Sequence, residues 1–190
     1  MAIIRKDGGT PKSLDLMPAG TRFPSWAPDG KSQLFHRMQT SQDPFAIYSL
    51  ELASGHATEM PGSRGLTDPV FSPDGSYVAA QADDDDRKLM LFDFQTRQWT
   101  HLVTAHTLFG VYWSRDGSWL YYQDVFGGVE QPIYRIHIPD RRVERVTTNG
   151  PFLRGDVRNY SFKALAPDDS PIIGLARATS DIYAVDFQLP

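Results

Sequence analysis

Acidic residues are the side chains of this sequence best suited to chemistry, and one pattern among them is an uninterrupted run of four carboxylates. The run extends from Asp83 to Asp86. Carboxylate oxygens are the ligands that hard cations such as Ca²⁺ prefer. The run lacks the interspersed glycine and asparagine, and the closing glutamate, of the EF-hand calcium loop. We therefore predict a solvated turn here, with cation binding as the alternative.

A second acidic pattern is an aspartate that recurs in a short motif, at intervals of about 40 to 50 residues. The motif is an aromatic residue or leucine, a small residue, proline or arginine, and then aspartate, which glycine follows in the first three copies. Proline, aspartate and glycine in this order favour a tight turn. An identical place in every copy indicates turn residues and not a catalytic carboxylate cluster. We assign this structural role to Asp29, Gly30, Asp74, Gly75, Asp116, Gly117 and Asp168.

The other residue types that perform catalysis or bind metals show no matching pattern. The five histidines, His36, His56, His101, His106 and His137, lack the spacing of metal ligands. The chain has no cysteine, which excludes thiolate metal sites and cysteine nucleophiles. It also has no Gly-x-Ser-x-Gly nucleophile elbow. We predict no catalytic residue, no cofactor and no bound metal, and therefore no enzymatic activity of the chain by itself.

The sequence predicts short β-strands on either side of these turn motifs. A β-prone run follows each turn, as 33–36, 77–80, 119–122 and 172–175. A third run follows, as 47–52, 89–94, 133–138 and 182–187, and its second half alternates apolar and polar residues. A more polar fourth run comes next, as 55–60, 98–103 and 142–147. With no helical periodicity, the pattern predicts an all-β fold, a β-propeller of four-stranded antiparallel blades.

The two ends of the chain fall within blades. Residues 1–7 align with a third strand and residues 10–17 with a fourth. We divide a single propeller domain, residues 1–190, into a partial blade 1–17, blades 18–62, 63–106 and 107–149, and a partial blade 150–190. This arrangement has one strand more than a closed four-bladed ring needs. We therefore expect an arc of a larger ring, or a ring that another chain completes, with unpaired strand edges that favour self-association.

The motif, followed by a hydrophobic strand and then by sequences such as Ile47-Tyr48-Ser49-Leu50-Glu51, resembles the propeller repeats of TolB and related bacterial proteins. The resemblance covers nearly the whole chain, and Arg115 and Asp169 depart from its pattern. It implies a propeller fold and says little about function. The segment 179–186 looks like the end of large bacterial proteins in which such a propeller follows a DNA-binding or kinase module. That resemblance implies the C-terminal sensor or scaffold part of a regulator.

Composition and charge restrict the partners. A net charge of −4 provides no basic surface for a phosphate backbone, so we predict no direct nucleic-acid binding. No apolar run is long enough to span a bilayer, so we predict no membrane segment. The apolar stretch after Met1 is too short for a signal peptide, so export would need an upstream segment or a processed start. The sequence does not decide between a periplasmic and a cytoplasmic location.

Two segments that interrupt the blade rhythm are the predicted partner surface, because binding residues are often on loops of a rigid scaffold. They are 123–132 and 152–160, and the residues we select in them are Val125, Phe126, Phe152, Arg154 and Arg158. The predicted function is a non-catalytic protein-binding or scaffold module. The alternatives are an accessory propeller domain of a peptidase or other hydrolase, and a carbohydrate-binding propeller.

Overall fold

The computed structural model of the chain describes residues 2–4, 7–13, 22–83, 87–125, 131–148, 150 and 157–177. Within these ranges the secondary structure is β-strands and turns, which confirms the predicted all-β class. None of the described segments forms a helix of the length and apolar character that crossing a membrane requires.

Three four-stranded antiparallel sheets form the body of the molecule. The first contains β3 (Arg22–Trp26), β4 (Ser32–Arg37), β5 (Ala46–Glu51) and β6 (Ala57–Glu59). The second contains β7 (Leu66–Phe71), β8 (Tyr77–Ala82), β9 (Lys88–Asp93) and β10 (Gln98–Thr104). The third contains β11 (Leu108–Trp113), β12 (Trp119–Asp124), β13 (Ile133–His137) and β14 (Val143–Thr147).

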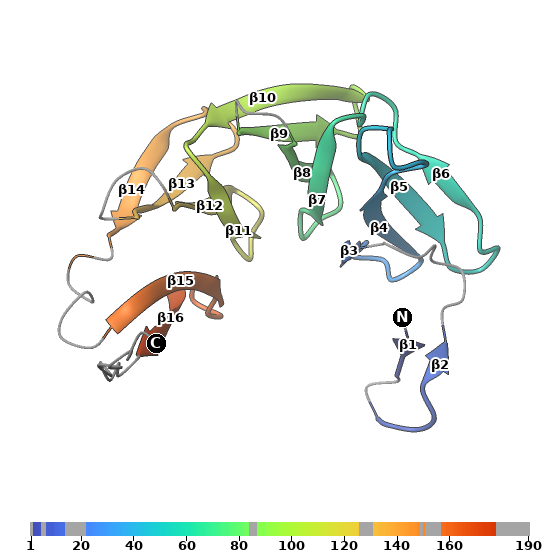
Figure 1. The fold of residues 1–190 in the computed structure, drawn as a ribbon, viewed down its shortest axis with the longest axis horizontal. Helices are drawn as coiled ribbons and strands as arrows, with labels where there is room; N and C mark the ends of the chain where they lie inside the picture. The colour runs from blue at the N-terminus through green and yellow to red at the C-terminus, as the bar shows by residue number, and fades with distance from the viewer. Residues whose placement is uncertain are drawn as a thin grey trace, which may run out of the picture.

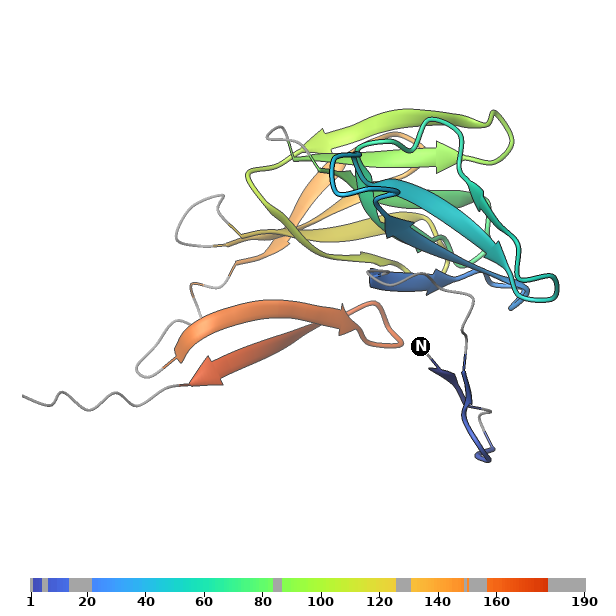
Figure 2. The same ribbon diagram turned by 45° about the vertical axis from the view of Figure 1, so that its right-hand side comes forward.

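Two antiparallel hairpins lie beyond the sheets, one near each end of the chain. They are β1 (Ala2–Ile3) with β2 (Lys12–Ser13), and β15 (Val157–Leu165) with β16 (Pro171–Arg177). Figure 1 shows the sheets side by side in an arc, with β7 and β11 on its inner side and β6, β10 and β14 on its outer side. Figure 2 shows the two hairpins at the ends of this arc. The described strands do not close a ring, so the fold is a partial propeller.

Apolar side chains fill the space between neighbouring sheets. Leu34 and Ile47 of the first sheet pack with Val78 and Phe92 of the second. A second cluster joins the second and third sheets, and a third joins Tyr121 and Ile133 to Tyr160 and Phe162 of β15. Because a sheet packs on both faces, β4 and β12 are buried along most of their length and do not alternate between buried and exposed residues.

The recurring aspartate motif forms the tight turn between the first two strands of each sheet and of the last hairpin. The aspartate side chain accepts the backbone N–H two residues further on, for example at 3.0 Å from Ser76 N to Asp74 Oδ1. The backbone bond from Ser118, with bonds from Ser114 and Ser118 side chains, lowers the pKa of Asp116 to about 2. Asp169 adopts the left-handed φ of 62° that glycine adopts in the other copies.

Consecutive turns contact one another along one side of the arc. A Cβ atom on Gly75 would lie 3.5 Å from Pro28, and one on Gly117 would lie 3.5 Å from Pro73. Arg115 N donates to Asp169 Oδ1 at 2.9 Å. The turns therefore help to set the spacing between sheets.

The innermost strands share a feature that the sequence analysis did not predict, a β-bulge at an equivalent place. Pairing shifts register between Arg22 and Ser25 in β3, between Thr67 and Val70 in β7, and between Phe109 and Tyr112 in β11. Pro24 and Pro69 lie inside the bulges, where a missing N–H is tolerated. Residues 68 and 110, equivalent positions, have φ of 50° and 59°.

The bulge of β11 requires glycine, and this gives a test of the fold. A Cβ atom on Gly110 would lie 2.9 Å from the carbonyl oxygen of Phe162, whereas one on Gly65, also left-handed, meets nothing within 4 Å. We expect Gly65→Ala to lower the free energy of unfolding by about 1 to 2 kcal/mol, the cost of the left-handed conformation. Gly110→Ala adds overpacking and should cost about 2 to 4 kcal/mol. Urea unfolding measures both, and equal losses would contradict the close approach to β15.

Candidate functional site

In two of the sheets, a side chain of the second strand makes a hydrogen bond to the innermost strand that follows it along the arc. His36 of β4 and Gln123 of β12 hold this position, each six residues after the glycine of its turn. Asp68 N donates to His36 Nδ1 at 3.0 Å, and Phe162 N donates to Gln123 Oε1 at 2.9 Å. We call these bonds the latches, because each satisfies a backbone N–H of the next innermost strand.

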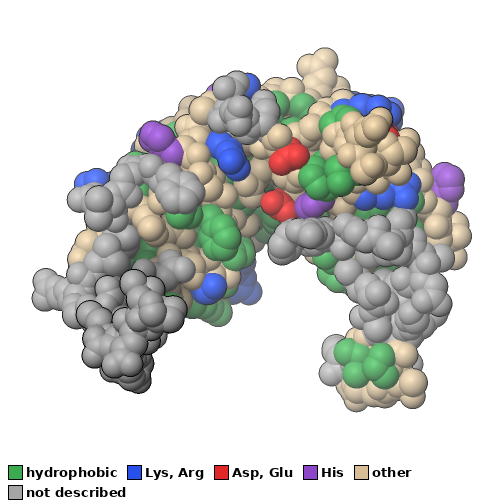
Figure 3. Space-filling model, in the orientation of Figure 1, with side chains coloured by type: hydrophobic (Ala, Val, Ile, Leu, Met, Phe, Trp, Pro, Cys, Tyr) green, Lys and Arg blue, Asp and Glu red, His purple; other side chains and the backbone are tan. Residues whose placement is uncertain are grey.

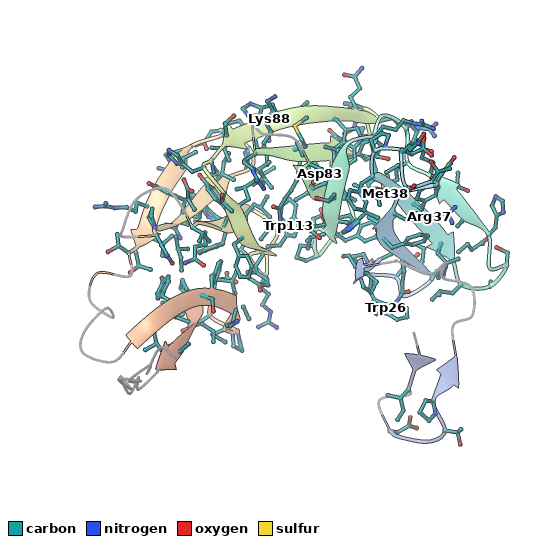
Figure 4. The ribbon with its side chains drawn as sticks, viewed as in Figure 1. Trp26, Arg37, Met38, Asp83, Lys88 and Trp113 are labelled. Carbon is teal, nitrogen blue, oxygen red and sulfur yellow. The ribbon has the colours of Figure 1, made fainter. Side chains whose placement is uncertain are left out.

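The junction between the second and third sheets has no latch. Gln81 of β8 occupies the equivalent position, yet its carboxamide has no hydrogen-bond partner within the residues that the structure describes. By analogy with the other two junctions, the partner of the Gln81 carboxamide would be the backbone N–H of Gly110. This junction is instead held by Trp113, whose indole N–H donates to Val70 O at 3.1 Å (Figure 4).

A cavity of about 420 Å³ opens beside the unlatched carboxamide. Strands β3, β7, β8 and β11 supply its walls, which places it on the inner side of the arc. The lining is mostly apolar, and its polar side chains are those of Ser25, Asp68, Gln81 and Tyr112; the apolar part consists of Pro24, Pro69, Val70, Leu108, Phe109, Gly110 and Val111. Phe109 is 48% exposed, which is unusual for phenylalanine.

Asp68 is the acidic group of the cavity, and one of its two carboxylate oxygens accepts no hydrogen bond. Oδ1 is buried without a hydrogen-bond partner and lies 3.7 Å from His36 Nδ1, too far for a bond. His36 Nδ1 accepts the Asp68 N–H and in that state has no proton to donate to this oxygen. The pKa of Asp68 is raised above its usual value: burial, the largest cause, raises it, the electrostatic effect of the neighbouring His36 lowers it, and Asp83 raises it.

These groups support binding more readily than catalysis. Ser25 carries the aliphatic hydroxyl of the lining that could act as a nucleophile, and its Oγ accepts a hydrogen bond from the Phe71 N–H at 3.1 Å. The one base type in the described lining is the Asp68 carboxylate, and no hydrogen bond joins it to Ser25. An apolar hollow with a few polar groups is the usual form of a ligand site.

The acidic run and the histidines do not form a metal site in the described part of the chain. Asp83, the first residue of the run, is described and lies beside β7 (Figure 4), whereas 84–86 lie outside the described residues. No group of three His, Asp or Glu side chains that could hold a metal is present among the described residues. The histidines are dispersed, as at His106, which contacts Asp124, and His137, which contacts Asp140.

The predicted partner surface lies mostly outside the described residues. Phe126, Phe152 and Arg154 belong to undescribed segments. Val125 is half-buried and its N–H donates to Thr107 O at 3.0 Å. Our interpretation of 152–160 as a loop is wrong in its last four residues, because β15 begins at Val157, and Arg158 belongs to this strand.

Sequence analysis also missed the cavity residues, although a signal for them exists. The latch position carries His36, Gln81 and Gln123, three polar residues in otherwise apolar strands. Asp68 stands three residues before the aromatic residue of its motif, where Gly110 stands in the next copy. A carboxylate next to proline in a strand that faces the arc's interior is the pattern that would have indicated the site.

The overall structure is similar to that of TolB proteins. TolB from Acinetobacter baumannii superposes with a TM-score of 0.71 at 25% sequence identity, covering 94% of this chain and 43% of that one. A putative TolB from Agrobacterium tumefaciens gives 0.66 at 17% identity, covering 94% and 66%. The β-propeller domain of the Trilobed protease from Pyrococcus furiosus gives 0.54 at 15% identity, covering 66% and 41%.

These comparisons confirm the resemblance seen in the sequence: the chain has a TolB-like β-propeller fold. It spans less than two thirds of the length of either TolB structure. The sequence matches no protein-family model, and no curated protein is significantly similar to it.

The missing latch gives a prediction with a matched pair of variants. Gln123→Leu removes the buried acceptor of the Phe162 N–H and should lower the free energy of unfolding by about 1 to 3 kcal/mol. Gln81→Leu removes no such bond, so we expect a change within about 0.5 kcal/mol. Chemical denaturation of both variants measures the difference. A loss from Gln81→Leu as large as that from Gln123→Leu would show that the junction between the second and third sheets is latched.

Proposed function

We propose that this chain is a non-catalytic binding module that holds an extended segment of a protein partner in the cavity on the inner side of its arc. The observation that carries this proposal is the unlatched junction, where an apolar hollow contains polar groups with unused hydrogen-bonding capacity. The TolB-like fold supports a propeller module, and the cavity supplies the site at which such a module would bind.

The lining favours a peptide segment over a rigid surface. The cavity and the partly exposed apolar side chains that line it, such as Phe109, can receive one side chain of the partner. Side chains inserted into pockets in this way are common at the centre of protein interfaces. The neighbouring polar groups of Gln81 and Tyr112 can bond to a backbone or side chain that enters with it. A flat partner would leave the hollow unfilled.

The enzyme-class alternative has less support from the cavity. An accessory propeller domain of a hydrolase would work beside a separate catalytic module, and the propeller of the Pyrococcus protease supports that arrangement for the fold in general. In the described lining, Ser25 and Asp68 are not hydrogen-bonded to each other as a nucleophile and its base would be, which favours chemistry supplied by another module.

Selection from a random peptide library tests this function. We expect the purified chain to enrich peptides whose affinity falls about tenfold or more in Phe109→Ala, because truncation removes a large apolar contact in the hollow. Ile172→Ala is the matched control: Ile172 is 47% exposed, against 48% for Phe109, and lies on β16 away from the cavity. Binding is measured by calorimetry or fluorescence anisotropy.

Two outcomes contradict the proposal. One is the absence of any enriched peptide after selection on a folded chain. The other is enriched peptides that bind Phe109→Ala as tightly as the parent chain, or that lose affinity equally in Ile172→Ala.

Self-association through strand edges is a separate prediction. Among the described strands, β16 pairs with β15 alone, so its other edge has no described partner. Unpaired edges recruit further strands. We expect light scattering of the purified chain to give a mass above that of one chain at micromolar concentrations, and a stable monomer would contradict this expectation.

A further inference from the structure

We infer that the side chain which enters the cavity is an arginine of the partner segment, with Asp68 as its counter-ion. This inference rests on the proposed function and specifies the chemistry that the site recognises. The juxtaposition that carries it is a carboxylate whose buried Oδ1 accepts no hydrogen bond, an unused carboxamide and two aromatic rings around one hollow.

The one ion-pair contact of Asp68 in the described part of the chain is a long one, 3.7 Å from Oδ1 to His36 Nδ1. The described lining of the cavity contains no Lys or Arg, and His36 Nδ1 accepts a hydrogen bond from the Asp68 N–H, so it donates none to the carboxylate. The Asp68 side chain is 38% exposed, but its Oδ1 atom is buried without a hydrogen bond, which is unfavourable for a charged oxygen. Acidic side chains and a histidine lie near the middle of the arc above its hollow (Figure 3). The cavity therefore complements a positive charge.

A side-chain cation fits this site better than a divalent metal ion. Ca²⁺ takes six to eight oxygen ligands. The described cavity offers one carboxylate, one carboxamide, one serine hydroxyl and one phenol. The lining is also largely apolar, which suits the methylene stem of a long basic side chain.

A guanidinium matches the groups better than an ammonium. Its planar fork of five N–H donors can bond to the Asp68 carboxylate and to Gln81 Oε1 together. Its flat faces stack on aromatic rings, which Phe109 and Tyr112 supply in the lining. An ammonium carries the charge but lacks the planar face.

The electrostatics of Asp68 give the expected coupling between stability and binding. Its raised pKa means that the folded chain holds this proton more tightly than the unfolded chain does. Stability from this group is therefore full at low pH and falls as the pH rises through the pKa of the folded state. Removing the charge should preserve or raise the melting temperature, while it removes the counter-ion for the ligand.

A nuclear magnetic resonance titration with small probes tests the inference. The probe is N-acetyl-arginine amide, and the two comparison probes are N-acetyl-citrulline amide, a neutral isostere, and N-acetyl-lysine amide. We expect saturable shifts of the Asp68, Gln81 and Gly110 amides with the arginine probe. Its affinity should exceed those of the citrulline and lysine probes by about tenfold and about threefold, respectively.

Asp68→Asn is the decisive variant, because asparagine has the same shape and tolerates the positive φ of this position. We expect it to lower the affinity for the arginine probe by about tenfold or more, with an unchanged or higher melting temperature. Asp29→Asn is the matched control, since it removes one charge from an exposed turn outside the cavity and keeps the acceptor for Lys31 N.

Three results would overturn the inference: no saturable shifts with the arginine probe, equal binding of the citrulline or lysine probe, and an Asp68→Asn variant that binds the arginine probe as tightly as the parent chain. If peptides selected from the library depend on Phe109 while the arginine probe fails, the inference falls and the proposed function stands. If the arginine probe binds while no peptide is enriched, the site chemistry stands and peptide binding falls.

Discussion

The backbone N–H groups in the bulges of the innermost strands are the constraint on which the rest of this structure depends. A bulge removes residues from the ladder within a sheet, so these buried donors need acceptors from elsewhere. At two junctions the preceding sheet supplies a side-chain acceptor: His36 for Asp68 in the bulge of β7, and Gln123 for Phe162, which borders the register shift between Phe162 and Ala164 in β15. The same position in consecutive strands thus joins separate sheets, while the contacting turns set their spacing.

The junction between the second and third sheets departs from this arrangement, and the candidate site lies there. Gly110 approaches Phe162 so closely that no side chain fits. Gln81 has no bond to it in the described part of the chain, and the hollow that remains contains the Asp68 carboxylate, whose buried Oδ1 accepts no hydrogen bond. Natural proteins retain such unfavourable groups where function needs them. The cost in stability at Asp68 is therefore consistent with a binding role.

Much of the fold could be predicted from the sequence, because its strongest signals are local. The chemistry of a turn depends on a few adjacent residues, so copies such as 71–75 indicated a repeated hairpin, and the repeat indicated a TolB-like propeller. Comparison with known structures confirmed both the fold class and the resemblance. The departures from simple alternation in β4 and β12 arise because each sheet packs on two neighbours.

The candidate site could not be predicted in the same way, because it depends on contacts between distant residues. His36, Gln81 and Gln123 stand at one position of the repeat, yet only the structure shows that Gln81 differs from the others in its bonding. We placed the partner surface on segments that interrupt the repeat, such as 152–160, and the structure places part of that segment in β15. The cavity is instead built on the strands themselves, where a bulge changes the direction of the backbone.

Amide hydrogen exchange at the three equivalent positions, Asp68, Gly110 and Phe162, tests the central claim most directly. The latches should protect the N–H groups of Asp68 and Phe162, so that they exchange only when neighbouring sheets separate. Gly110, which has no side-chain acceptor across its junction, should exchange markedly faster than either. Equal protection of all three amides would contradict the account, because it would mean that the junction between the second and third sheets is closed like the others.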